Sequence, residues 1–289
     1  MSPLLDIDRL RLVIGRQPVL RDVSLQVPAG SVHGLVGESG AGKTMIAKAV
    51  LGIQPGVAEI ISGGITFDGR DITHLNDRAR RALMGRGISM IPQDPMTALN
   101  PVFRIGSQIT DVLRLHLGLN RRAAVARAGE LLHEVHIRNV ERVMRQYPHE
   151  LSGGMRQRVL IAIAFACRPK LIVADEPSTA LDVTVQRQVL ALIKELQAHE
   201  GTAVLFVTHD LGVVAKVCDT MTVLHSGRVI EEGSVTDCFA RPAHAYTRAL
   251  MAATPRYDRP ADALLPVPQA VTDDLLSATA AWDEQHATA

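Results

Sequence analysis

The pattern of apolar and polar residues divides the chain into parts with different expected structure. The two kinds of residue alternate at 4–12, 19–27 and 63–69, and this period of two predicts strands with one buried face. Between about 95 and 166, apolar residues recur every three or four positions, as in amphipathic helices. From 170 to 210, unbroken apolar runs flank a long helical pattern, which is typical of parallel strands covered on both faces. This order predicts an α/β fold whose doubly wound core is interrupted by a helical insert.

The end of the chain has a different pattern. Residues 221–233 predict a short hairpin with Ser226 and Gly227 at its turn. Prolines then recur between 255 and 268, and the last residues are polar and rich in alanine. We therefore expect 255–289 to be a loosely ordered, Pro-rich tail, or one that docks on another surface.

Composition and charge exclude several classes of protein. The 289 residues are 47% hydrophobic, enough for a sizeable core, and a net charge of +1 argues against a protein held on nucleic acid by bulk charge. An arginine-rich run at 77–86 is typical of a solvated helix face. The longest apolar run, 159–167, is about half of what a bilayer span requires, so we expect a soluble chain. Cys167, Cys218 and Cys238 are too few and too scattered for a disulfide framework or a zinc site, which predicts reduced thiols.

A glycine-rich loop between a predicted strand and a predicted helix carries the clearest chemical signal. Its sequence, GESGAGKT, fills the pattern G-x-x-x-x-G-K-[ST]. Glycines let several backbone N–H groups converge on one point, and the helix start adds the positive end of its dipole. We expect the loop to bind the phosphates of a nucleotide, with its lysine at the β- and γ-phosphates and its threonine hydroxyl on Mg²⁺; an ordinary glycine turn is the alternative. The loop consists of Gly37, Glu38, Ser39, Gly40, Ala41, Gly42, Lys43 and Thr44.

Polar side chains follow three further apolar runs. Asp175 and Glu176 end one run, Gln93 follows another, and His209 follows the third. Because ligands gather at the carboxyl ends of parallel strands, we expect these side chains near the phosphates. Asp175 would complete the Mg²⁺ shell, with the amide oxygen of Gln93 as a further ligand. Glu176 would activate the water that attacks the γ-phosphate, and His209 would contact that phosphate. A helix cap for the two acids and a structural role for the histidine are the alternatives.

The stretch LSGGMRQR predicts a second anion-binding helix start. Ser152 is a suitable N-cap, and Gly153 and Gly154 leave the first N–H groups of the helix open to an anion. A chain with a single phosphate loop does not need a second anion-binding helix start for its own nucleotide. We therefore expect this helix to close on a nucleotide held by another chain, with a purely structural cap as the alternative.

Taken in order, these motifs resemble those of an ABC transporter ATPase subunit. GESGAGKT, the glutamine of IPQDP, LSGGMRQR, LIVADEP, STALD and THD resemble that family's Walker A, Q-loop, signature, Walker B, D-loop and H-loop. The resemblance covers roughly residues 4–254. It implies a RecA-like P-loop core with an antiparallel β subdomain and an inserted helical subdomain. On this basis we expect an ATPase domain over 1–254, with the helical subdomain at about 95–166, and a separate tail over 255–289.

The resemblance also implies a mechanism. Two subunits would enclose two ATP molecules with Mg²⁺, each chain closing its partner's site with Ser152, Gly153, Gly154 and Gln157. Asp182 of the D-loop would lie along that interface. Gln93 would link the nucleotide to the helical subdomain, which would contact a membrane partner. Closure would then depend on ATP.

Two other segments are more selective. QDPMTALNPVFRIGSQI and RPAHAYTRALMAATP resemble segments of the ATPases that serve oligopeptide, dipeptide and nickel importers. That group implies two transmembrane permease subunits, a second ATPase subunit and a solute-binding protein outside the membrane. The chain would lie at the cytoplasmic face of a bacterial inner membrane. A peptide is the expected solute, and nickel or another chelated metal the alternative. A soluble ABC ATPase without a membrane partner is less favoured, since the chain has one motif set and no long coiled coil.

The sequence departs from the family pattern in two places. Ile14 stands where relatives usually offer an aromatic residue to stack on adenine, and no aromatic residue precedes Phe67. Weak discrimination between ATP and GTP is therefore expected. No cysteine follows Cys238, so the iron–sulfur centre of some peptide-importer ATPases is not expected.

Overall fold

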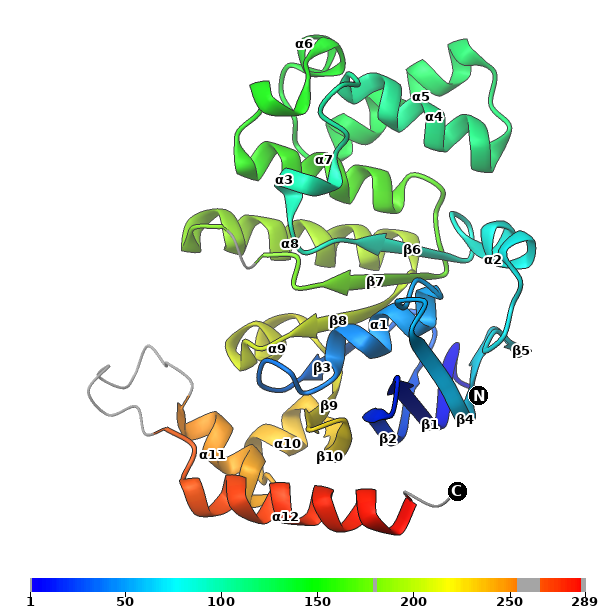
Figure 1. The fold of residues 1–289 in the computed structure, drawn as a ribbon. Coiled ribbons are helices and arrows are strands. Elements are labelled where there is room, and N and C mark those ends of the chain that lie inside the picture. The colour runs from blue at the N-terminus through cyan, green and yellow to red at the C-terminus, as the bar shows by residue number, and fades with distance from the viewer. Residues whose placement is uncertain (1, 179–180, 254–265, 287–289) are drawn as a thin grey trace. The chain divides into compact units, whose positions relative to one another are not determined.

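A computed structural model describes residues 2–178, 181–253 and 266–286 (Figure 1). The chain divides into two compact units. The first unit comprises 1–75 and 205–289, and the second comprises 76–204. No helix in the described part of the chain is both long enough and apolar enough to cross a bilayer.

The first unit contains an antiparallel sheet in the order β2-β1-β4-β5 and four neighbouring strands of a second sheet in the order β10-β9-β3-β8. Apolar residues of β1 and β2 alternate into the core, as the period of two predicts. The hairpin predicted after 220 is present, with Ser226 and Gly227 at positive φ in its turn. The strands are β1 Leu5–Ile14, β2 Gln17–Val27, β3 Val32–Val36, β4 Ala58–Phe67, β5 Arg70–Asp71, β8 Ala203–Thr208 (its first two residues belong to the second unit), β9 Thr220–His225 and β10 Arg228–Ser234.

Helices of the first unit include the one that follows the glycine-rich loop. It begins after Gly42 without a side-chain cap and ends at Gly52, which adopts the left-handed conformation of a helix C-cap. The helices are α1 Lys43–Leu51, α9 Leu211–Val217, α10 Val235–Ala240, α11 Ala245–Ala253 and α12 Gln269–His286.

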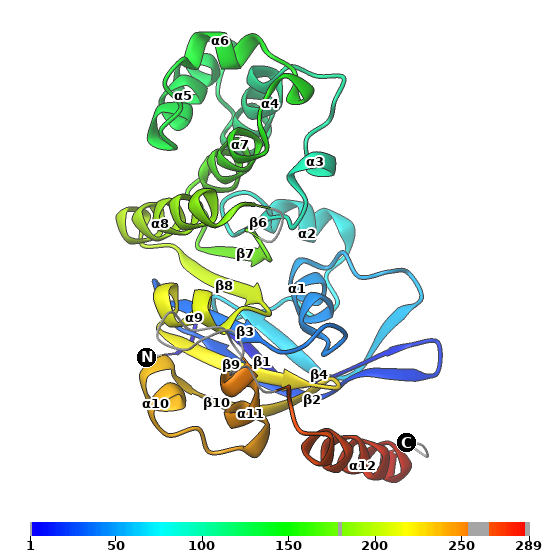
Figure 2. The same cartoon turned by 90° about the vertical axis from the view of Figure 1, so that its left-hand side faces the viewer.

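Helix α12 corrects the expectation of a loosely ordered tail. Its 18 residues form a regular helix beside β2 and β10 of the first unit (Figure 2). The prolines misled the interpretation because they stop before the helix: residues 269–286 contain neither proline nor glycine. The remaining parts of the expected tail, 254–265 and 287–289, lie outside the described residues.

The second unit is mostly helical and carries two parallel strands, β6 and β7. Helices α4, α5, α6 and α7 pack against one another (Figure 1). Side-chain caps start three of the longer helices: Asn120 for α5, Ser152 for α7 and Asp182 for α8. The elements are α2 Asp77–Leu83, β6 Ile88–Ile91, α3 Pro95–Ala98, α4 Ile105–Leu117, α5 Arg121–Glu134, α6 Val140–Arg145, η1 Pro148–Glu150, α7 Gly153–Phe165, β7 Leu171–Asp175 and α8 Val183–Glu200.

All three cysteines are free and buried. Burial raises the pKa of the Cys167 thiol. Burial also raises the pKa of the Cys238 thiol, and the nearby carboxylates of Glu231 and Asp237 raise it further.

Buried His33 on β3 leads to a prediction about acid stability. Its ring nitrogens lie 2.8 Å from Thr220 Oγ1 and 2.9 Å from Thr222 Oγ1. Burial lowers its pKa from 6.5 to about 4. Between pH 6.5 and about 4, His33 therefore binds a proton in the unfolded chain but stays neutral in the folded chain. The free energy of unfolding falls as the pH is lowered through this range. We expect a loss of about 2 kcal/mol from this residue between pH 7 and 5.

Chemical denaturation of the native chain and of His33→Gln at both pH values measures this effect. The variant should lose less stability on acidification, whereas His74→Gln, at an exposed position, should behave like the native chain. An equal loss in the native chain and in His33→Gln would contradict the assignment.

Candidate functional site

The glycine-rich loop of the first unit connects β3 to α1. It packs closely against Leu20 and Leu224. A Cβ atom at Gly37 would lie 2.2 Å from the carbonyl oxygen of Leu224, and one at Gly42 would lie 2.9 Å from Cδ2 of Leu20. Gly40 and Gly42 also have positive φ values, of 83° and 101°. These positions require glycine because a side chain would clash or strain the backbone.

Backbone N–H groups of this loop are available to a ligand. Among the residues that the structure describes, none accepts a hydrogen bond from the N–H groups of Gly40, Gly42 or Thr44. Helix α1 has no acidic residue in its first turn and no capping side chain, so its positive end is not neutralised locally. A concave set of unpaired N–H groups at a helix start is suited to phosphate oxygens.

Lys43 is the cation of this loop. Its side chain is buried, and Nζ donates to the carbonyl oxygens of Gly37 and Glu38, at 2.7 and 2.8 Å. These two bonds hold the ammonium group over the loop rather than in solvent. Thr44 is exposed, and so is His209, directly after β8 in the same unit. Thus the first unit holds the glycine-rich loop, a buried lysine and an exposed hydroxyl.

The second unit brings Gln93 and Glu176 together. Nε2 of Gln93 donates to Oε2 of Glu176 at 2.9 Å. Glu176 follows β7 with a φ of 44°, a conformation that residues other than glycine rarely adopt. Asp175, the last residue of β7, is buried. Two carboxyl groups and an amide therefore lie at the ends of β7 and β6, as the sequence predicts.

Helix α7 begins with the sequence Ser152, Gly153, Gly154. Ser152 accepts a hydrogen bond from the N–H of Met155 at 3.3 Å, and within the described part of the chain no group accepts from the N–H groups of the two glycines. Ser152 and Gly153 are exposed, whereas a Cβ at Gly154 would lie 2.9 Å from Cγ1 of Val185. This helix start can receive an anion from outside.

Gln157 and Asp182 are placed differently from what their expected roles suggest. Gln157 is fully buried on α7, and its amide has no hydrogen-bond partner among the described residues. Its side chain is thus not presented to a second chain in this structure, contrary to the expected role in trans. Asp182 caps α8 by accepting from the N–H groups of Thr184 and Val185, at 3.0 and 2.9 Å. It remains exposed while capping, so a role at an interface stays a prediction.

Ile14 is half-buried at the end of β1, opposite Gln17 of β2. The sequence interpretation missed that the same sheet does contact an aromatic residue. Trp282 of α12 donates from Nε1 to Asp22 Oδ2 at 3.2 Å, and the guanidinium of Arg11 lies 5.1 Å from its ring centroid. Trp282 is the only tryptophan of the chain. Its presence in the expected tail was the one sequence feature that could have indicated a packed segment there.

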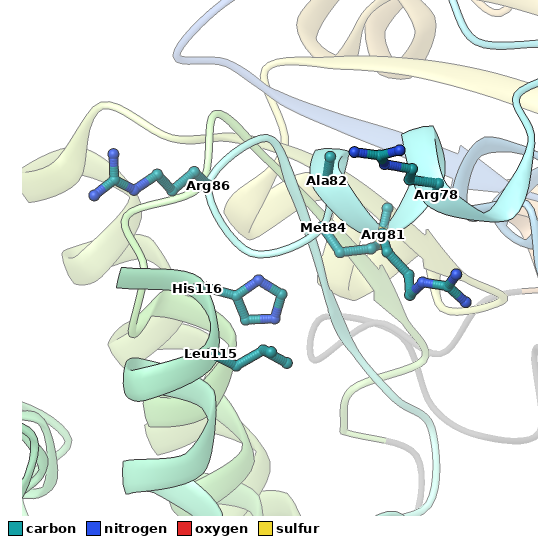
Figure 3. Close-up of a pocket in the computed structure, with 7 residues that line it drawn as sticks. All are labelled: Arg78, Arg81, Ala82, Met84, Arg86, Leu115 and His116. Atoms are coloured by element: carbon teal, nitrogen blue, oxygen red, sulfur yellow. The ribbon is translucent and has the colours of Figure 1, made fainter. Parts of the chain in front are cut away.

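A cavity of about 600 Å³ in the second unit is lined by basic and apolar side chains (Figure 3). Its arginines are exposed, as expected of a solvated basic face, and the residues that line it include no carboxylate. The lining residues are Arg78, Arg81, Ala82, Met84, Arg86, Leu115 and His116.

Comparisons with known proteins agree with this geometry. The family model described as ABC transporter matches residues 20–179, and the model described as oligopeptide/dipeptide transporter, C-terminal region, matches residues 230–278. The chain is 46% identical to a probable D,D-dipeptide transport ATP-binding protein of Escherichia coli, over 93% of this chain and 84% of that protein. It is 44% identical to the oligopeptide transport ATP-binding protein OppD of Salmonella typhimurium, over 92% of this chain and 80% of that protein.

Solved structures give the same answer for the fold. A dimeric ATP-binding cassette in a post-hydrolysis state, bound to ADP and Pi, superposes with a TM-score of 0.71 at 25% identity, covering 80% of this chain and 98% of that one. CbiO1 of Clostridium perfringens, part of an ABC transporter complex, superposes with a TM-score of 0.73 at 25% identity, covering 83% and 92% of the two chains.

The chain belongs to the ABC transporter family. Within it, the chain is an ATP-hydrolysing subunit with the P-loop ABC ATPase fold, and both expectations from the sequence are confirmed. The resemblance to the peptide-transporter group is confirmed as well.

Proposed function

We propose that this chain drives the uptake of an oligopeptide or dipeptide, as one of two ATPase subunits beneath a membrane permease. The observation that carries this proposal is the match of 230–278 to the C-terminal region of oligopeptide/dipeptide transporters. The same chain also has a glycine-rich loop with open N–H groups. Relatives named for peptide transport align over nearly the whole chain and support the same solute class.

We further propose a role for each residue of the site. The loop 37–44 binds the phosphates of ATP, and Lys43 neutralises them. Thr44 and Asp175 would each supply an oxygen ligand to Mg²⁺, a hard cation that prefers such ligands, and Gln93 would contribute its amide oxygen. When bound, the cation would neutralise charge on the phosphates. Glu176 accepts a proton from the attacking water, and His209 contacts the γ-phosphate.

A second chain completes the site in this proposal. Ser152, Gly153 and Gly154 present exposed or open N–H groups that would receive the γ-phosphate of a nucleotide bound by the other subunit. Solved relatives that form dimeric cassettes support this arrangement. Asp182 would then lie along the interface between the two subunits.

An exposed apolar segment supports a permease as a further partner. Met96, Val102 and Phe103 are 60%, 70% and 54% exposed. The loop that carries the last two is held in place by Gln108, whose amide bonds to the backbone of Asn100 and Phe103. Large apolar side chains on an ordered, exposed loop are typical of a protein interface. The chain would then bind the cytoplasmic face of a bacterial inner membrane, with a solute-binding protein on the other side.

Affinity purification tests this proposal. Tagged Glu176→Gln chain is recovered from its host in mild detergent with ATP and Mg²⁺, and its partners are identified by mass spectrometry. We expect two permease subunits and a second ATPase subunit. Val102→Ser with Phe103→Ser should lose the permease, while Ile53→Ser, at a residue that is 54% exposed elsewhere, should retain it. Recovery of ribosomal or DNA-repair proteins without a membrane protein would overturn the transporter.

A further inference from the structure

Helix α12 is attached to β2 by an ion pair between Arg21 and Asp283. Nε and Nη2 of Arg21 donate to the two carboxylate oxygens of Asp283, at 2.6 and 2.7 Å. The side chains are 11% and 32% exposed, so the pair is largely shielded from water. A bidentate pair of this kind fixes both the distance and the orientation of its partners.

The same arginine holds the turn between β9 and β10. Its Nη1 donates to the carbonyl oxygen of Ser226 at 2.8 Å, and its backbone N–H donates to the carbonyl oxygen of Gly227, also at 2.8 Å. Arg228, the first residue of β10 after the turn, donates from Nη1 to the carbonyl oxygen of Ala278 on α12, at 3.1 Å. The turn is therefore linked to the helix through Arg21 before Gly227 and directly by Arg228 after it.

This turn contacts the phosphate loop directly. The N–H of Gly227 donates to the carbonyl oxygen of Ala41 at 2.9 Å. Gly227 is packed tightly: a Cβ there would lie 2.0 Å from the carbonyl oxygen of Val19. Its Cα lies 3.5 Å from where a Cβ of Gly42 would be. With so little free space, a displacement of the turn would be transmitted to Ala41 and Gly42.

Further contacts fix α12 against β1 and β2. Trp282 donates to Asp22, which in turn pairs with Arg11, and the guanidinium of Arg11 lies over the indole ring. His286 stacks on the same ring, with centroids 4.0 Å apart. These contacts place Asp283 next to Arg21 whenever the helix is docked.

We propose that α12 is a positioning element for the phosphate loop and that Arg21 is its positioning residue. Asp283 orients the guanidinium of Arg21, Arg21 holds the turn at 226–228, and the turn holds Ala41 in the loop. In this proposal neither side chain contacts the nucleotide itself. The inference rests on the proposed binding of ATP by the loop 37–44 and adds that its affinity depends on the C-terminal helix.

Binding of ATP to the full-length chain, measured by calorimetry, tests the proposal. Asp283→Asn removes the charge that orients Arg21 and should weaken ATP binding about fivefold or more, the usual range for coupling between separate sites. Asp283→Glu should restore most of the affinity. Asp273→Asn is the matched control, because this residue lies on the same helix and, within the described part of the chain, its carboxylate bonds only to Gln269. In ATPase assays the KM for ATP should rise while kcat is largely kept.

The outcomes are distinguishable. If the native chain binds ATP and Asp283→Asn binds it equally well, or if kcat falls with KM unchanged, the positioning role is overturned and the proposed nucleotide site stands. If the native chain does not bind ATP, the proposed site itself fails. Thermal unfolding of each variant separates weaker binding from lost structure. Should Asp283→Asn not fold, Arg21→Lys tests the same link, since it keeps the charge but not the bidentate geometry.

Discussion

Replacing Lys43 by alanine should abolish measurable binding of ATP to this chain. The ammonium group is buried and held over the loop by the carbonyl oxygens of Gly37 and Glu38, so in the proposed complex it would meet the phosphates without having to be ordered on binding. A hydrogen bond between charged groups contributes about 1.5–3 kcal/mol. Losing two such contacts to phosphate oxygens would weaken binding by about 100-fold or more. Calorimetry with ATP, or displacement of a fluorescent ATP analogue, measures the change.

Lys48→Ala is the matched control for this variant. It removes the same charge from the last turn of the same helix, away from the loop, and should bind ATP like the native chain. Thermal unfolding should show both variants folded. If Lys43→Ala binds ATP with native affinity, the loop does not hold the phosphates in the way proposed here.

Replacing Glu176 by glutamine should stop turnover while ATP still binds. Glutamine has the shape of glutamate, and its amide oxygen can still accept the hydrogen bond that Gln93 now donates to Oε2. It cannot take a proton from water, and loss of a general base typically costs about 10²–10⁴-fold in rate. Phosphate release measures turnover, and size-exclusion chromatography with ATP measures whether dimers accumulate.

Glu195→Gln provides the comparison, since that carboxylate lies on the exposed face of α8 and should not affect turnover. Hydrolysis at the native rate by Glu176→Gln would remove the proposed role of this residue as the base. Loss of ATP binding by the same variant would instead indicate that the carboxylate holds the metal or the loop.

Local features of the sequence predicted most of the fold and where several candidate site residues lie in it. Strands β1, β2 and β4 follow the period of two, and α4 and α5 follow the helical period. The glycines at 37 and 42 indicated a tightly folded loop, and Ser152 indicated a helix N-cap. These features succeed because each depends on residues that are close in sequence.

Contacts between distant residues could not be predicted in the same way. Arg21 and Asp283 are 262 residues apart, and nothing in either neighbourhood indicates the other. Gln157 lies within a motif, but whether its side chain points outward or inward depends on packing around α7. The C-terminal helix was missed because the prolines before it dominated the interpretation of the whole segment.

Burial of the three cysteines has a practical consequence for observing this chain at work. Burial shields all three thiols from reagents, and the raised pKa values of Cys167 and Cys238 make their thiolates rare at neutral pH, where the thiolate is the form that reacts with maleimides. A cysteine introduced at an exposed position should therefore react far faster than the native ones. A fluorophore could be attached to one chosen helix without first removing Cys167, Cys218 or Cys238. A pair of such labels, one on α12 and one on α7, would report motion during ATP turnover in an otherwise native sequence.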